Sequence, residues 1–187
     1  MMQNRRFLSL AALALAVVLA VPVVAGAEML AESKPHPEVA KQLKEFKSKA
    51  GDLRREADQL NSFSNNRQLS WQSHAYQQSE TREHINQLGR MLAQLENQKA
   101  QASETQRIAI EQARPHLAAA ALNLTQAIEM LNERHSHIGQ ADYIEALRDL
   151  YAHSDSLCQK LDAILDYENS KLRFESLNLQ PASSDAS

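Results

Sequence analysis

Between Glu38 and Leu179 the chain has almost no residues that favour turns. Across this stretch the turn formers are one proline and three glycines: Pro115, Gly51, Gly89 and Gly139. Glycine and proline supply the backbone conformations of most tight turns, so their scarcity excludes folds built from many short elements. The chain is therefore expected to form a few long helices.

Apolar residues recur along four segments of this stretch at steps of three and four, which keeps them on one face of a helix. The first seam is Val39, Leu43, Phe46, Ala50, Leu53, Ala57 and Leu60. The second is Trp71, His74, Gln78, Thr81, Ile85, Leu88, Leu92 and Leu95. The third is Arg107, Ile110, Arg114, Leu117, Ala121, Leu124, Ile128 and Leu131. The fourth is Tyr143, Leu147, Leu150, Ser154, Leu157, Leu161 and Ile164.

Polar residues mark the connections between these segments. A cluster over residues 61–66 indicates the end of the first helix, and Ser70 is a suitable cap for the second. Ser103 and Gln106 form a capping box for the third helix. Neither glycine nor proline marks a turn there, so one continuous helix is the alternative.

Gly139 is expected to end the third helix in a left-handed conformation. Asp142 and Glu145 are expected to cap the fourth. Similar helix lengths, about 28–36 residues each, and short connections favour antiparallel neighbours. The sequence predicts an all-α fold: an up-down-up-down four-helix bundle over residues 37–178, with coiled-coil-like seams. An extension over residues 28–36 precedes it, and a disordered tail over residues 179–187 follows.

Residues 1–27 have the pattern of a signal peptide. Arg5 and Arg6 precede an apolar run over residues 7–24, and Ala25-Gly26-Ala27 fits a cleavage site. An uncleaved membrane anchor is the alternative, which Pro22 and the small residues at the cleavage site argue against. A Sec-type signal fits better than the twin-arginine type because the apolar run is strongly hydrophobic. We expect a periplasmic or extracellular protein with no membrane contact after cleavage.

Cleavage would also change the charge of the chain. It removes two of the 20 basic residues and none of the 23 acidic ones, so the net charge falls from −3 to −5. The charges are mild and interspersed, which argues against nucleic acid as a partner. Cys158 is the only cysteine, so an intramolecular disulfide is excluded, and a disulfide to a second chain is the alternative to a free thiol.

Polar residues interrupt the second seam, and this interruption is the candidate functional site. In an antiparallel bundle His74 would share a layer with residues near 133–135 and 143–147, with Trp71 beside it. Four candidate ligand-binding residues would then meet: His74, Gln78, His135 and Tyr143. Such a cluster can bind a metal, a haem edge or a small polar ligand. A polar seam position also fixes helix register, and we prefer that interpretation.

The sequence predicts no specific metal site, cofactor or catalytic residue. Di-iron bundles use Glu-x-x-His twice, a spacing absent from residues 80–84 and 133–137. The chain has no Cys-x-x-Cys-His sequence for haem attachment, no nucleophile elbow and no glycine-rich phosphate loop. Few loops remain on which to build an active site. We therefore expect a protein that is not an enzyme.

Two short segments of the second helix, residues 70–75 and 82–90, resemble parts of uncharacterised exported helical proteins of soil bacteria. The resemblance covers about twenty residues. It implies a bacterial source and no function.

The sequence-based hypothesis is an exported, non-catalytic helical bundle that acts through protein–protein contact or self-association. The alternative is a periplasmic bundle that binds a small ligand, a metal or a haem through the end of the bundle that holds His74.

Overall fold

The computed structural model describes residues 34–64, 66 and 68–178. The predicted signal peptide, residues 28–33 of the predicted extension, and the predicted disordered tail lie outside these described residues. Residues 34–36 precede the first helix without helical structure.

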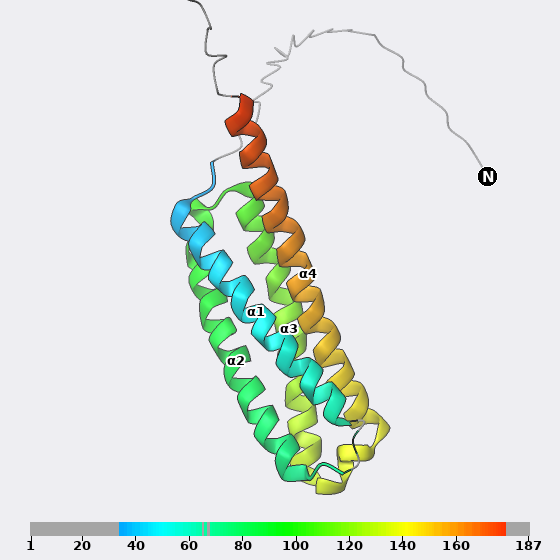
Figure 1. Cartoon of the computed structure of the whole chain (residues 1–187). Coiled ribbons are helices and arrows are strands. Elements are labelled where there is room, and N and C mark those ends of the chain that lie inside the picture. The colour runs from blue at the N-terminus through cyan, green and yellow to red at the C-terminus, as the bar shows by residue number, and fades with distance from the viewer. Residues whose placement is uncertain (1–33, 65, 67, 179–187) are drawn as a thin grey trace, which may run out of the picture. The chain divides into compact units, whose positions relative to one another are not determined.

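Four long helices make up the described part of the chain: α1 (Pro37–Ser64), α2 (Trp71–Asn97), α3 (Glu104–Glu133) and α4 (Ala141–Asn178). Two short 3-10 turns, η1 (Lys99–Gln101) and η2 (His135–Gly139), lie in the connections. Each helix packs against the next, and α4 packs back against α1, which closes a bundle of antiparallel neighbours (Figure 1). The predicted four-helix bundle is confirmed. None of the described helices is long and apolar enough to cross a membrane.

The seams of α1 and α4 form the core as predicted. All seven residues of the α1 seam are buried, with Phe46 among the largest fully buried side chains. The α4 seam is buried from Tyr143 to Leu161, and Ile164 is half-buried. Aliphatic side chains on facing helices thus exclude water along the bundle axis, which supplies most of the stability of long helices.

The connection between α2 and α3 confirms the predicted capping box. The Ser103 hydroxyl accepts a hydrogen bond from the backbone N–H of Gln106, and the side-chain oxygen of Gln106 accepts one from the backbone N–H of Ser103. The η1 turn precedes this cap, so the alternative of one continuous helix is wrong. Ser70 caps α2 as predicted, by accepting from the Ser73 amide.

The predicted seam of α3 is partly wrong, because Arg107 and Arg114 are exposed on the helix surface. Arg107 pairs with Glu104, and Arg114 pairs with Glu96 at 2.5 Å. Small residues take the core positions beside Ile110, Leu117, Leu124 and Leu131: Ala109, Ala113, Ala120 and Ala127. Alanine lets helix backbones approach closely, so α3 can lie tightly against α4, its most extensive neighbour.

The end of α3 also differs from the prediction. α3 runs through Pro115 and ends at Glu133, because Arg134 has an extended backbone with φ −150° and ψ 119°. Gly139 therefore ends η2 and not α3, and its backbone is outside the left-handed region. The Asp142 carboxylate accepts from the Tyr143 amide within the first turn of α4, so it acts one position inside the helix and is not the N-cap residue.

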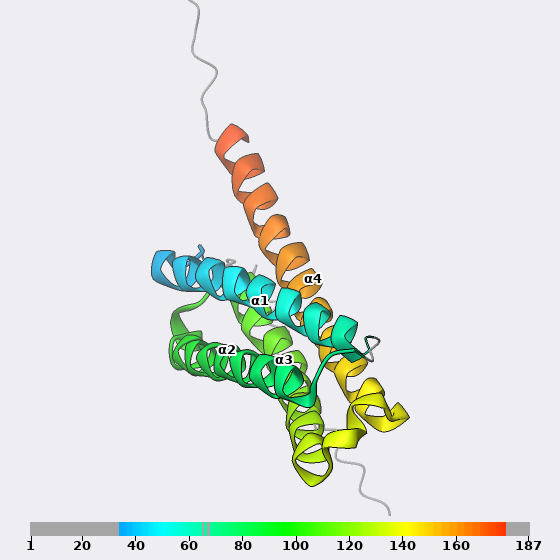
Figure 2. The same cartoon turned by 60° about the horizontal axis from the view of Figure 1, so that its bottom comes forward.

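α4 ends at Asn178, the predicted end of the bundle, and is the longest of the four described helices, with 38 residues against 27 to 30 in the other three. Its last buried residue is Glu168, which contacts Ser103 at the start of α3. Residues 169–178 extend beyond this layer, as both views show at the red end of α4 (Figures 1 and 2). The matched helix lengths expected from the sequence are therefore wrong for α4. We call residues 166–178 the α4 extension.

Candidate functional site

The polar interruption of the second seam forms a buried contact between α2 and α4. His74 and Gln78 lie one turn apart near the start of α2, and their side chains are 1% and 2% exposed. The Ser70 cap fixes the start of α2, and thereby places both side chains on its inward face. Tyr143, fully buried, reaches them from the first turn of α4. We call His74, Gln78 and Tyr143 the polar node.

Two hydrogen bonds join the three side chains of the polar node. Gln78 Nε2 donates to Tyr143 Oη at 3.0 Å, and Tyr143 Oη lies 2.9 Å from His74 Nδ1. We assign the phenol hydrogen to the bond with His74 Nδ1, because the amide nitrogen of Gln78 can only donate and this choice gives every polar atom of the two bonds a complementary partner. This assignment makes His74 a neutral imidazole that carries its proton on Nε2.

Burial favours the neutral forms of both titratable groups in the node. It lowers the pKa of His74 below the ordinary value of 6.5. It also raises the pKa of Tyr143 far above its ordinary value of 10, against a smaller opposing effect of the hydrogen bond from Gln78. The node is therefore an uncharged layer within the core at neutral pH.

His135, the fourth candidate residue, is not part of this layer. It lies exposed on η2 and stacks on Trp71, with ring centroids 3.8 Å apart and planes inclined by 2°. The physical reason is the early end of α3, which places His135 on a 3-10 turn at the bundle end and not on an inward helix face. The structure thus brings together three of the four predicted residues.

The chemistry open to the polar node is that of a structural contact. Thr81, the next polar seam residue, donates to the backbone carbonyl of Gln77 and is satisfied within its own helix. The Tyr143 hydroxyl occupies His74 Nδ1, so in the assigned tautomer the unprotonated ring nitrogen is not available as a base or a metal ligand. A ligand at this point would have to displace Tyr143 from His74.

The other described histidines lie apart from the node. His84 Nδ1 is 2.5 Å from Glu56 across the α1–α2 contact. His116 and His153 face each other between α3 and α4, with ring centroids 6.2 Å apart. Within the described residues, three or more His, Cys, Asp or Glu side chains nowhere group in a way that could hold a metal ion. Cys158 is buried with a free thiol, and burial raises its pKa to about 11.

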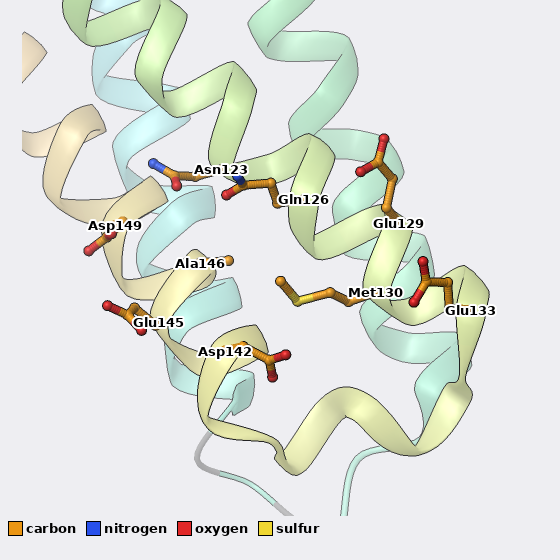
Figure 3. Close-up of a pocket in the computed structure, with 9 residues that line it drawn as sticks. All are labelled: Asn123, Gln126, Glu129, Met130, Glu133, Asp142, Glu145, Ala146 and Asp149. Carbon is orange, nitrogen blue, oxygen red and sulfur yellow. The ribbon is translucent and has the colours of Figure 1, made fainter.

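An acidic groove between α3 and α4 was not predicted from the sequence (Figure 3). Its volume is about 420 Å³, and Met130 points across it toward Ala146. Five carboxylates line it: Glu129, Glu133, Asp142, Glu145 and Asp149. The sequence pattern that could have predicted this groove is the run of acidic residues at helical spacing before and after the η2 turn. Among the described residues no lysine or arginine pairs with these carboxylates, so the groove has a negative potential at neutral pH.

A second buried polar cluster, also not predicted, ties the other end of the bundle together. Ser103 Oγ donates to Glu168 Oε1 at 3.1 Å. The side chain of Gln106 forms two hydrogen bonds with the backbone of His36, at 3.1 Å and 3.2 Å. These contacts hold the residue before α1, the start of α3 and the end of the packed part of α4 in one layer.

Burial raises the pKa of Glu168 above its ordinary value of 4.5, and the hydrogen bond from Ser103 opposes the shift. Because this pKa is raised in the fold, the contribution of Glu168 to the free energy of unfolding is most favourable below pH 4.5. This contribution falls as the carboxyl ionises at higher pH. Glu168→Gln keeps an acceptor for Ser103 without the charge. We expect this variant to melt about 1–3 °C higher than wild type at pH 7.

Thermal unfolding followed by circular dichroism at pH 7 and pH 4 measures this effect. The difference should vanish at pH 4, where Glu168 is protonated in the wild type. Glu175→Gln, an exposed change further along α4, is the control and should leave the melting temperature unchanged. A melting temperature of Glu168→Gln below wild type at pH 7 would contradict the prediction.

No protein-family model, curated protein or solved structure matches this chain. The function is therefore inferred from the geometry of the described residues.

Proposed function

We propose that the protein is an exported, non-catalytic helical bundle that acts by association with a second copy of itself through the α4 extension. The observation that carries the proposal is a stripe of exposed large apolar side chains on this segment. Tyr167, Phe174 and Leu177 are 60%, 67% and 70% exposed. Steps of seven and three place them on one face of the helix. Such a face in water indicates a contact surface.

The α4 extension is largely exposed beyond Glu168. None of its side chains beyond Glu168 is buried. A helix end with few tertiary contacts is marginally stable in water, so a partner helix would stabilise it.

The charges beside the stripe favour a second copy as the partner. Asp166 and Arg173 carry opposite charges and lie seven residues apart, so they share one flank of the stripe. Two α4 extensions that run antiparallel about a two-fold axis bring Asp166 of each chain against Arg173 of the other. Interfaces between identical subunits are usually self-complementary in this way.

The geometry of the polar node supports a non-catalytic role. Its hydroxyl, imidazole and amide groups bind one another, which leaves no activated nucleophile or base in the node. The proposal of export depends on the sequence of residues 1–27, and it places the protein in the periplasm or outside the cell after cleavage by a Sec-type pathway.

Sedimentation equilibrium of residues 28–187 tests the proposal. We expect the wild type to dimerise, and Tyr167→Ser/Phe174→Ser to raise the dissociation constant at least ~100-fold, because two aromatic side chains per subunit lose their buried surface. Tyr76→Ser is the matched control, since Tyr76 is 67% exposed on α2, and it should dimerise like the wild type.

A charge exchange tests the antiparallel arrangement of the two helices. Arg173→Asp should weaken association, because it places two negative charges against each other across the interface. Asp166→Arg/Arg173→Asp should restore association, because residues 166 and 173 again carry opposite charges. Two results would refute the proposed surface. One is a wild type that stays monomeric at every protein concentration tested, and the other is a Tyr167→Ser/Phe174→Ser variant that dimerises like the wild type.

The alternative, a bundle that binds a ligand, a metal or a haem near His74, is tested separately. Native mass spectrometry and absorbance spectra of protein purified from the periplasm would reveal a bound group. Loss of that group in His74→Ala would favour the alternative over self-association.

A further inference from the structure

His74 lies where three helices meet. Its ring packs edge-on against Phe63 of α1, with centroids 5.8 Å apart and planes at 67°. On the other side it lies 5.7 Å from the ring of Tyr143 at the start of α4. The imidazole thus links the first turns of α2 to α1 beside it and to α4 across the core, in a buried position.

The direction of the hydrogen bonds makes this contact specific for neutral His74. Tyr143 accepts from Gln78 and donates to His74 Nδ1. A proton on Nδ1 turns the acceptor into a donor, so the phenol hydrogen loses its acceptor within the node. The result is a buried imidazolium beside a buried phenol whose hydrogen has no acceptor in the node, and both are costly in the core.

No neighbouring charge compensates for a proton on His74. Facing it are Phe63 from α1 and the neutral Tyr143 from α4. Other titratable groups at this end of the bundle include the exposed Glu133 and Arg134 at the end of α3, His135 on η2, which stacks on Trp71, and the carboxylates of the acidic groove, of which Asp142 accepts from the backbone amide of Tyr143. Burial is the cause that lowers the pKa of His74, and no neighbouring charge contributes to the shift.

The sign of the effect follows from this shift. The pKa of His74 in the fold lies below that of the unfolded chain, so below about pH 6.5 the unfolded state binds more protons. The contact is therefore intact at neutral pH and is weakened progressively as the pH falls below 6.5.

We propose that the polar node is an acid-sensitive latch, in which protonation of His74 releases the first turns of α2 from α4 and opens this end of the bundle. Release would expose apolar surface of Tyr143 and Phe63, and so would make part of the core available for contact in acid surroundings. The latch lies at the opposite end of α4 from the α4 extension. It goes beyond the proposed self-association and does not depend on it.

Hydrogen exchange measured by mass spectrometry tests the latch. With exchange rates corrected for pH, we expect protection in residues 71–85 and 141–150 to fall up to about tenfold per pH unit below 6.5. Residues 43–57 of α1 should keep their protection. His74→Gln, which cannot titrate, should show no such pH dependence.

The chain offers matched controls for the other histidines. His84→Gln, on the same helix and paired with Glu56, should retain the wild-type response at the α2 start. Burial and, to a smaller extent, the charge of His153 lower the pKa of His116, so this histidine could also give a pH response. His116→Gln removes that response and leaves the response of His74. Trp71, the only tryptophan, gives a fluorescence signal from the opening end, and His135→Gln removes the direct influence of the stacked imidazole on it.

A histidine titration by nuclear magnetic resonance keeps the test decisive if His74→Gln does not fold. In the wild type, His74 should take up its proton at the same pH at which the α2 start loses protection. Uptake without loss of protection would overturn the latch, as would equal protection at pH 7.5 and 5.0 or a pH response that persists in His74→Gln. None of these readouts depends on the α4 extension, so failure of the latch and failure of self-association are distinguishable.

Discussion

Tyr143→Phe is expected to lower the free energy of unfolding by about 2–4 kcal/mol, although it removes a single oxygen atom. Tyr143 Oη is the shared partner of Gln78 Nε2 and His74 Nδ1, both of which are buried. Without it each polar atom keeps the cost of leaving water and loses the bond that offsets this cost, about 1–3 kcal/mol for each atom. The ring remains, so little of the loss comes from a cavity.

Urea unfolding at pH 7.5 measures this loss, and Tyr76→Phe on the exposed face of α2 is the control, with a change within about 0.5 kcal/mol. A triple change, His74→Phe/Gln78→Leu/Tyr143→Phe, removes every polar group of the node. We expect it to recover much of the stability, because no orphaned group remains. If Tyr143→Phe proves as stable as the wild type, the two hydrogen bonds contribute nothing and the node does not hold α2 to α4.

The fold was predictable because two local signals agreed along most of the chain. The spacing of Val39, Leu43 and Phe46 fixes the inward face of α1 before any tertiary contact forms, and the same holds for the α4 seam. Serine caps then locate the starts of α2 and α3, because a side-chain acceptor at these positions stabilises the first turn. Local physics and the final packing coincide at these places.

The prediction failed where packing overrides periodicity. Arg107 and Arg114 share their spacing with Ile110 and Leu117, but alanine at the adjacent core positions allows a closer helix contact, so the arginines face solvent. Gly139 favoured a helix end, yet the extended backbone at Arg134 ends α3 earlier. That displacement moved His135 out of the node and onto Trp71, and one local error therefore changed the predicted site.

The buried link between Ser103 and Glu168 was beyond sequence reasoning for a different reason. It joins residues 65 positions apart, and its existence depends on how far α4 runs past the start of α3. Ser103 was predictable as a cap for α3, but its second contact was not. The hydroxyl accepts from Gln106 and donates to Glu168, so one side chain performs both tasks.

Ser103→Ala should for this reason cost about 2–4 kcal/mol at pH 7, where loss of a helix cap alone costs about 1 kcal/mol. The excess arises because the buried Glu168 carboxyl loses its hydrogen-bond donor. Ser70→Ala is the matched control, because it removes the exposed hydroxyl that caps α2. It should lower the free energy of unfolding by only the ~1 kcal/mol of a lost helix cap.

The pH dependence separates the two roles of Ser103. At pH 4 Glu168 is protonated in the fold, since burial raises its pKa, so the cost of Ser103→Ala should fall toward that of Ser70→Ala. Glu168→Gln should reduce the cost in the same way at pH 7, because it removes the charge that Ser103 stabilises. Urea unfolding of the two single variants and of Ser103→Ala/Glu168→Gln gives this coupling. If Ser103→Ala and Ser70→Ala cost the same at both pH values, the layer that joins α3 to α4 derives its stability from apolar packing and not from this hydrogen bond.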